Sequence, residues 1–195
     1  MPRYEEWKKT ANEMGLIEVN NLKPPMVVGD YRNHHIRIHH GTYGEDNETH
    51  YYVEFLNPSS IMMHIWRRRV FSDRMDYRAT ELGLKDISIG DPEFSGEIMV
   101  KGNKENDVKA ILDLSIRDKI NILLPTGVFN NSIIEVGCLY EYSTQGSSHN
   151  VEELGLTHYF DKRTFSETKG DAKRFRLIID ALIDIVEKIE TYTPS

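Results

Sequence analysis

The sequence has little cysteine, no long apolar run and no excess of positive charge. Its one cysteine, Cys138, excludes an intramolecular disulfide and a cysteine-based zinc cluster within one chain. No apolar run approaches the roughly 20 residues that span a bilayer, and the N-terminus lacks the apolar segment of a signal peptide. The sequence therefore predicts a soluble, cytoplasmic protein with no membrane partner, in which Cys138 is a small buried core residue.

The balance of charge is acidic, with a formal net charge of -7 over 195 residues. Nucleic-acid binding through bulk electrostatics needs clustered positive charge, so this balance disfavours a nucleic-acid partner. The chain also lacks a glycine-rich phosphate loop, a serine nucleophile elbow, a His-Glu-x-x-His motif and a dinucleotide-binding fingerprint. Hydrophobic residues make up 39% of the chain, enough for a core, and the length favours one domain over residues 1–195.

Local patterns predict an α+β fold. The apolar spacing of a helix recurs in four segments: residues 3–15, 72–83, 104–124 and 171–191. Short apolar or alternating runs predict strands in six segments: residues 26–28, 34–40, 49–56, 61–66, 98–100 and 132–143, the last as two short strands or one strand bent around Gly137. We expect an antiparallel sheet of about six strands, packed against the long helices of residues 104–124 and 171–191, with residues 1–20 as an N-terminal helical arm. Residues 41–48 are predicted to form a turn, and residues 145–150 a loop.

The middle of the chain, residues 86–102, combines a predicted strand at 87–89, a Gly-Asp-Pro turn and a second strand at 97–101. Its segment Ile89-Gly90-Asp91-Pro92-Glu93-Phe94 resembles one in an uncharacterised family found in bacteria and archaea. Members carry Gly-Asp-Pro-x-Phe-Asp, whereas Ser95 stands at the last position here. The resemblance extends over residues 5–190 and implies an architecture without an established activity. Ser95 argues against a catalytic acid at that position.

Two carboxylates of this segment, Asp91 and Glu93, are candidate ligand-binding residues. Paired carboxylates can hold a divalent cation or serve as acid and base. The alternative is turn chemistry, in which Gly90 permits an unusual φ, Asp91 bonds to the backbone ahead and Phe94 enters the core.

Three consecutive arginines, Arg67, Arg68 and Arg69, follow the predicted strand of residues 61–66 and are further candidate ligand-binding residues. Guanidinium groups at a strand end can bind a phosphate or an acidic partner. The alternative is a solvated strand end, in which the arginine stems cover apolar surface. Trp66, directly before them, is predicted to lie in the core.

Four histidines on or beside predicted strands are candidate metal ligands: His35, His39, His50 and His64. In the strand of residues 34–40, His35 and His39 share a face, with Arg37 between them. A zinc site needs three or four converging ligands, whereas these two positions are roughly 13 Å apart along a strand. The alternative is a solvated strand face.

These observations favour a non-enzymatic binding or interaction module, without a cofactor, that takes a protein or small-molecule partner. The alternative is a metal-dependent hydrolase that uses the histidine-rich strand, nearby carboxylates and a divalent metal. In residues 171–191, Leu177, Ile183 and Ile185 widen the apolar stripe beyond one packing face. That width predicts either burial between a sheet and a neighbouring helix or a homo-oligomer formed through this helix.

Overall fold

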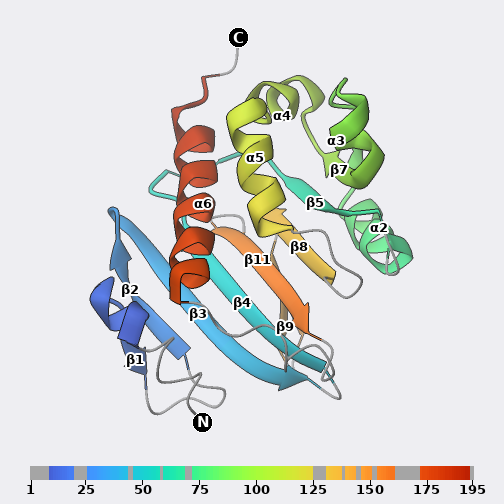
Figure 1. Ribbon diagram of the computed structural model, residues 1–195. Coiled ribbons are helices and arrows are strands. Elements are labelled where there is room, and N and C mark those ends of the chain that lie inside the picture. The colour runs from blue at the N-terminus through green and yellow to red at the C-terminus, as the bar shows by residue number, and fades with distance from the viewer. Residues whose placement is uncertain are drawn as a thin grey trace.

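The computed structural model describes residues 9–19, 26–43, 46–57, 59–68, 72–124, 131–137, 139–143, 146–150, 153–160 and 172–193. In this part of the chain one large sheet carries helices against its face (Figure 1). Residues 9–13 are helical. The further elements are, in chain order, β1 Ile17–Val19, β2 Met26–Tyr31, β3 His34–Tyr43, β4 Asp46–Glu54, β5 Met63–Arg67, α2 Ser72–Glu81, β6 Lys85–Asp86, α3 Pro92–Glu97, β7 Ile98–Gly102, α4 Glu105–Ile111, α5 Leu114–Leu123, β8 Asn131–Val136, β9 Leu139–Ser143, β10 Gly146–Asn150, β11 Glu153–Phe160 and α6 Ala172–Thr191.

The large sheet has nine strands in the order β1-β2-β3-β4-β11-β8-β5-β7-β6, and a separate two-stranded sheet pairs β9 with β10. Every pairing is antiparallel. The predicted α+β class is confirmed, but the expected number of about six strands is too low. The meander of neighbouring strands ends at β4, because β11 and β8, from later in the chain, lie between β4 and β5.

The main core lies between this sheet and helices α3, α4, α5 and α6. Strand residues Met63, Ile65 and Ile134 enter it from the sheet, and α6 contributes its apolar stripe except Leu177, which is exposed. Ile183 and Ile185 are fully buried inside the chain. Burial against the sheet and α5 therefore explains both, and the width of the stripe alone requires no second copy. None of the helices in the described residues is long and apolar enough to cross a membrane.

A smaller core lies on the opposite face of the sheet, beneath α2. Trp66 and Ile133 pack there against Ala79 and Leu84, so the predicted core position of Trp66 is confirmed. The helix predicted over residues 72–83 is also confirmed, and it is followed by Gly83 with a φ of +74°. One face of the sheet is therefore covered by helices α3 to α6, and the opposite face is partly covered by α2.

Predictions for one helix and two strands in the middle of the chain differ from the structure. Residues 104–124 form α4 and α5 instead of one helix, because Asp113 begins a new helix by accepting a hydrogen bond from the Ile116 N–H. The strand predicted over residues 97–101 begins one residue later, because Pro92–Glu97 forms α3, whose N-cap is Asp91. The strand predicted over residues 87–89 is wrong: these residues are not in a strand, and the short β6 covers only Lys85–Asp86.

The predicted turn over residues 41–48 and the predicted loop over residues 145–150 are also wrong. β3 continues to Tyr43 and β4 begins at Asp46, while residues 146–150 form β10. The described part of the N-terminal arm, from residue 9, joins the sheet through β1 and places Ala11 and Met14 in the main core. Each of these segments is held in a sheet by pairing with a neighbouring strand, which local sequence does not predict.

Candidate functional site

The two faces of the sheet differ in character because successive strand residues alternate between them. In β5, Met63 and Ile65 face the main core, whereas His64 and Trp66 point to the opposite side. We call this opposite side the second face. α2 lies against it near β5, and β9 lies next to β11. Ionisable residues interrupt the apolar pattern on this face.

One row of opposed residues crosses all nine strands on the second face. Each member pairs with the next across a strand boundary, in the order Ile17, Val28, Arg37, Tyr52, Gly155, Glu135, His64, Lys101 and Asp86. We call the five residues Arg37, Tyr52, Glu135, His64 and Lys101 the polar row. Gly155 stands between Tyr52 and Glu135 and contributes no side chain to it.

The centre of the polar row is a buried pair of ionisable side chains. His64 is 0% exposed and Glu135 5% exposed, and the His64 Nε2 lies 3.8 Å from the Glu135 Oε1. Histidine and glutamate are rarely buried this deeply unless they are paired. Removing two such groups from water opposes folding even when they attract one another. A role other than stability is therefore the better reason for their presence in the sheet.

Lys101 extends the polar row beyond His64 and is only 8% exposed. Its Nζ lies 2.9 Å from Asp76 and 3.5 Å from Asp86, and donates a hydrogen bond of 3.2 Å to the Thr80 hydroxyl. Burial opposes the charge of Lys101, but the two carboxylates outweigh burial and raise its pKa. This end of the row thus holds a permanent ammonium group with its counter-ions.

Arg37 and Tyr52 form the other end of the polar row. The Arg37 guanidinium carbon lies 5.0 Å from the centre of the Tyr52 ring, a cation–π contact, and its Nε is 4.0 Å from Glu54. His50, two residues before Tyr52 on β4, stacks on that ring with 6.1 Å between centres and 7° between planes. This end therefore combines a cation with two parallel aromatic rings.

The predicted metal ligands do not form one cluster on the second face. The His35 ring bonds Asp30 at 2.9 Å, and His39 is opposite His50 across β3 and β4. His64 is three strands away from His50, about 14 Å at the usual strand spacing. Among the described residues, no group of three histidines, cysteines or carboxylates is placed to hold a metal ion.

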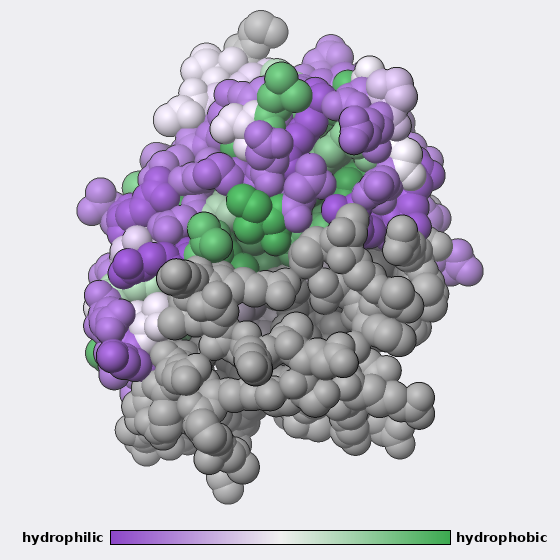
Figure 2. Space-filling model, in the orientation of Figure 1, coloured by the Kyte–Doolittle hydropathy of each residue, from purple (hydrophilic) through white to green (hydrophobic). Residues whose placement is uncertain are grey.

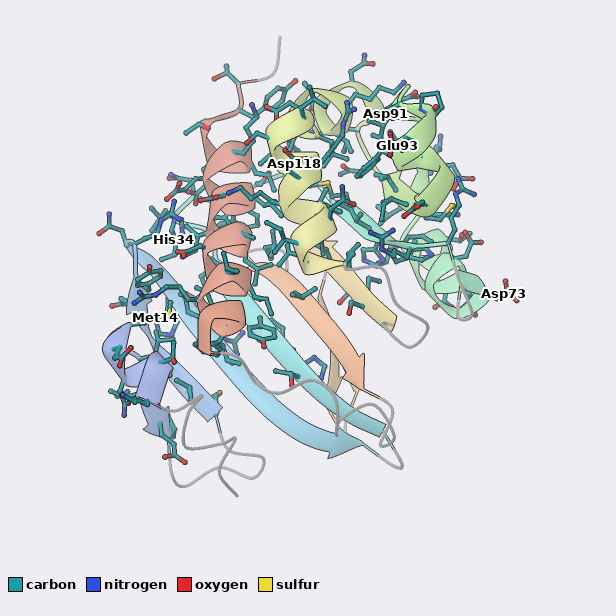
Figure 3. The ribbon with its side chains drawn as sticks, in the orientation of Figure 1. Met14, His34, Asp73, Asp91, Glu93 and Asp118 are labelled. Atoms are coloured by element: carbon teal, nitrogen blue, oxygen red, sulfur yellow. The ribbon has the colours of Figure 1, made fainter. Side chains whose placement is uncertain are left out.

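Asp91 and Glu93 lie on the helix side of the sheet, away from these histidines. Asp91 caps α3 by accepting hydrogen bonds from the Glu93 and Phe94 N–H groups, and its Oδ2 lies 2.9 Å from Arg117. The Phe94 N–H lowers the pKa of Asp91, and Arg117 lowers it further. Figure 3 shows Asp91 and Glu93 at the start of α3, across α5 and α6 from His34. The turn chemistry predicted for Asp91 is present.

Arg67, the last residue of β5, and Arg68, which follows it, contact neighbouring parts of the fold. Arg67 donates to the carbonyl of Leu124 at the end of α5 and pairs with Glu97, so it joins two helices to the strand end. The Arg68 Nε donates to the Ser95 carbonyl at 3.0 Å. Arg69 and Cys138 lie outside the described residues, and the ligand-binding role of the arginines stays a prediction.

Sequence reasoning missed four members of the polar row: Arg37, Tyr52, Glu135 and Lys101. Two of them carried a usable signal, because each places a charge inside or at the end of an apolar strand. Glu135 stands in Ile133-Ile134-Glu135-Val136, and Lys101 follows Ile98-Met99-Val100. In a strand buried on both faces, an isolated charge is the informative residue.

Comparisons with known proteins do not assign this site. No protein-family model matches the chain, and no curated protein matches it. A search of solved structures finds the "crystal structure of the mycobacterial trehalose monomycolate transport factor A, TtfA", with 12% identity and a TM-score of 0.49 over 99% of this chain and 98% of that chain. At that TM-score no argument about fold or function rests on the likeness. The family resemblance of residues 89–94 stays a prediction.

Proposed function

We propose that this protein is a non-enzymatic binding module whose ligand site is the polar row on the second face of the sheet. The observation that carries the proposal is the buried pair of His64 and Glu135. Two ionisable groups on neighbouring inner strands oppose folding, so a binding role is the simplest reason to keep them. The proposal keeps the cytoplasm as the compartment, because a chain with one cysteine needs no oxidising environment.

The chemistry of the row favours a small ligand with charges of both signs. Glu135 offers a carboxylate to an ammonium or N–H group, and Arg37 offers a guanidinium to a carboxylate or carbonyl oxygen. Gly155 separates Tyr52 from Glu135 by two strand spacings, about 10 Å.

Binding is favoured over turnover because the charges at both ends of the row already have counter-charges in the fold. Lys101 is held by Asp76 and Asp86, and Arg37 lies near Glu54. Such pairing holds side chains in place, which suits recognition. The metal-dependent hydrolase remains the alternative outcome, with His64 and Glu135 as its ligands.

The test is a thermal-shift screen followed by calorimetry, with amino acids, betaine, dicarboxylates and zinc chloride as probes. We expect a zwitterionic probe to bind the wild-type protein and to bind Glu135→Gln roughly 10- to 100-fold more weakly, as for one lost charged hydrogen bond. Glu93→Gln is the matched control, because Glu93 is an exposed carboxylate on the other side of the sheet.

Equal affinity of the wild-type protein and Glu135→Gln for every probe that binds would refute the site. Loss of binding in Glu93→Gln alone would move the site to α3. Zinc could instead stabilise the wild-type protein but not His64→Gln, and the wild-type protein could hydrolyse a model ester. Those two results together would favour the metal-dependent hydrolase over the binding module.

A further inference from the structure

A buried histidine on the helix side of the sheet lies between two groups that can only accept hydrogen bonds. His34 begins β3, and its Nδ1 lies 3.2 Å from the main-chain carbonyl oxygen of Glu54, the last residue of β4. Its Nε2 lies 4.0 Å from a carboxylate oxygen of Glu190, in the last turn of α6. Figure 3 shows His34 beside α6. The ring therefore connects the last turn of α6 with the end of β4.

Glu190 contacts the same stretch of chain a second time. Its Oε1 accepts hydrogen bonds from the main-chain N–H groups of Leu56 and Asn57, which lie just after β4. Its other oxygen, Oε2, is the one that faces His34. One side chain of α6 thus meets both the histidine and the main chain that leaves β4.

The contact between His34 and Glu190 is shielded from water. On the side shown in Figure 2, the surface towards the C-terminal end is mainly hydrophilic, as solvated charges make it. The two side chains of this contact are instead only 2% and 10% exposed. Water has little access to them, so their own protons decide whether the contact is favourable.

The number of protons on the His34 ring sets how well its neighbours are satisfied. A neutral imidazole carries one N–H, whichever nitrogen holds it, whereas an imidazolium carries two. Because the Glu54 carbonyl and the Glu190 carboxylate are both acceptors, a neutral ring turns a lone pair towards one of them. An imidazolium serves both, and its charge attracts Glu190. Histidine is the side chain whose charge changes most readily near neutral pH.

The other charged groups on the elements around His34 have partners of their own. The contacts are those of Asp30 with His35, Tyr31 with Asp180, Arg32 with Asp184 and Glu187, Arg37 with the Glu54 carboxylate, and Lys188 with Asp113. None of these contacts involves the His34 ring. Within the described residues, Glu190 is therefore the carboxylate that faces it.

We propose that His34 and Glu190 form a pH-sensitive latch between α6 and the end of β4. With His34 protonated, the latch holds the last turn of α6 against the main chain that follows β4. When the pH rises and the ring loses a proton, two acceptors face each other and the last turn of α6 loosens. The apolar stripe keeps the rest of α6 in the core. The latch does not depend on the proposed ligand site, which lies on the other face of the sheet.

The test is NMR spectroscopy of the full chain at about pH 6 and about pH 8, which bracket the range in which histidine changes charge. Ring-nitrogen chemical shifts report the protons on His34, and the loss of these signals in His34→Gln assigns them. We expect an imidazolium at the lower pH. At the higher pH, the protection of the Leu56 and Asn57 amides from hydrogen exchange should fall roughly tenfold, as for one lost charged hydrogen bond.

Glu190→Gln distinguishes the latch from a purely structural contact. The new amide still accepts from the two main-chain N–H groups through its oxygen, and its NH₂ can donate to a neutral His34 ring. Protection in this variant should therefore be the same at both pH values. Glu187→Gln and His35→Gln are the matched controls, since each residue has another partner, and both should keep the wild-type pH dependence.

Three outcomes would overturn the latch. The His34 ring could be neutral at the lower pH, the wild-type protection of Leu56 and Asn57 could be equal at both pH values, or Glu190→Gln could keep the wild-type pH dependence. The first two measurements use the wild-type chain, so they decide the question even where a variant fails to fold.

Discussion

The buried contact of His64 with Glu135 is expected to reduce the stability of the folded chain relative to an apolar pair. The decisive perturbation is a double-mutant cycle with His64→Leu, Glu135→Met and the two together. Each single substitution leaves one ionisable group among buried neighbours, since the two side chains are 0% and 5% exposed. The double substitution removes both groups and keeps side chains of similar volume.

The magnitudes follow from the burial of each partner. His64→Leu should cost about 3–5 kcal/mol, because a buried carboxylate loses its partner. Glu135→Met should cost about 1–3 kcal/mol, the desolvation of an imidazole that loses one partner. The double variant should lie between the wild-type stability and about 4 kcal/mol above it. The coupling free energy is therefore at least about 4 kcal/mol, with the double variant more stable than either single variant.

Urea denaturation followed by circular dichroism measures all four corners of the cycle. Additive losses, with the double variant least stable, would refute the reasoning, because the two groups would then stabilise the fold independently. A double variant that is stable and still binds the probe ligands would separate the pair from the proposed site.

Three further predictions concern parts of the fold away from the polar row. Arg32→Ala should reduce the stability by about 1–2 kcal/mol, because its ion pairs are lost. Arg32 has a φ of +52°, which glycine adopts more easily than alanine, so Arg32→Gly should lose about 0.5–1 kcal/mol less than Arg32→Ala. The midpoints of urea denaturation compare the two variants. Burial raises the pKa of Asp184, but Lys119 and Arg32 outweigh burial and hold it below its usual value. The folded chain then binds fewer protons than the unfolded chain, so stability falls with pH below about pH 5, and Asp184→Asn should flatten that dependence in acid titrations. Gly137→Ala should cost about 2–4 kcal/mol in thermal unfolding, because φ is +70° and the new Cβ would lie 2.6 Å from the Ile61 carbonyl oxygen; an unchanged melting temperature would contradict this.

Local patterns predicted the elements whose periodicity is strong. The alternation in residues 34–40 gave a strand with His35, Arg37 and His39 on one face, and the pairing of β3 agrees with it. The apolar stripe of residues 171–191 gave α6 almost to the residue. In both segments burial of one face is decided by residues within a few positions of each other.

The elements that were predicted wrongly depend on single residues or on strand partners that are distant in sequence. Asp113 splits the predicted helix of residues 104–124, because an aspartate at an N-cap satisfies backbone donors that the preceding helix cannot. Residues 146–150, Gly-Ser-Ser-His-Asn, have poor strand propensity, yet they pair with β9 along their whole length. Neither outcome follows from apolar periodicity.

The polar row could not be predicted because its five members lie on five strands, and β8, which carries Glu135, comes from much later in the chain than β3, β4 and β5. His64 and Glu135 are adjacent only because β8 pairs with β5, a pairing across more than 60 residues. The histidines of residues 34–40 form an obvious cluster in the sequence. Glu135, the buried partner of His64, is instead a single charged residue in an apolar run. Strand order, which local sequence does not encode, brings them together.

Chemical-shift mapping tests the central claim, that the polar row is the ligand site, most directly. Amide spectra of the labelled full chain are recorded while the best-binding probe of the thermal-shift screen is added. The account predicts that the largest changes fall on Tyr52, Gly155, Glu135, His64 and their strand neighbours. Changes centred instead on Asp91 and Glu93, or confined to the arginines that follow β5, would contradict it.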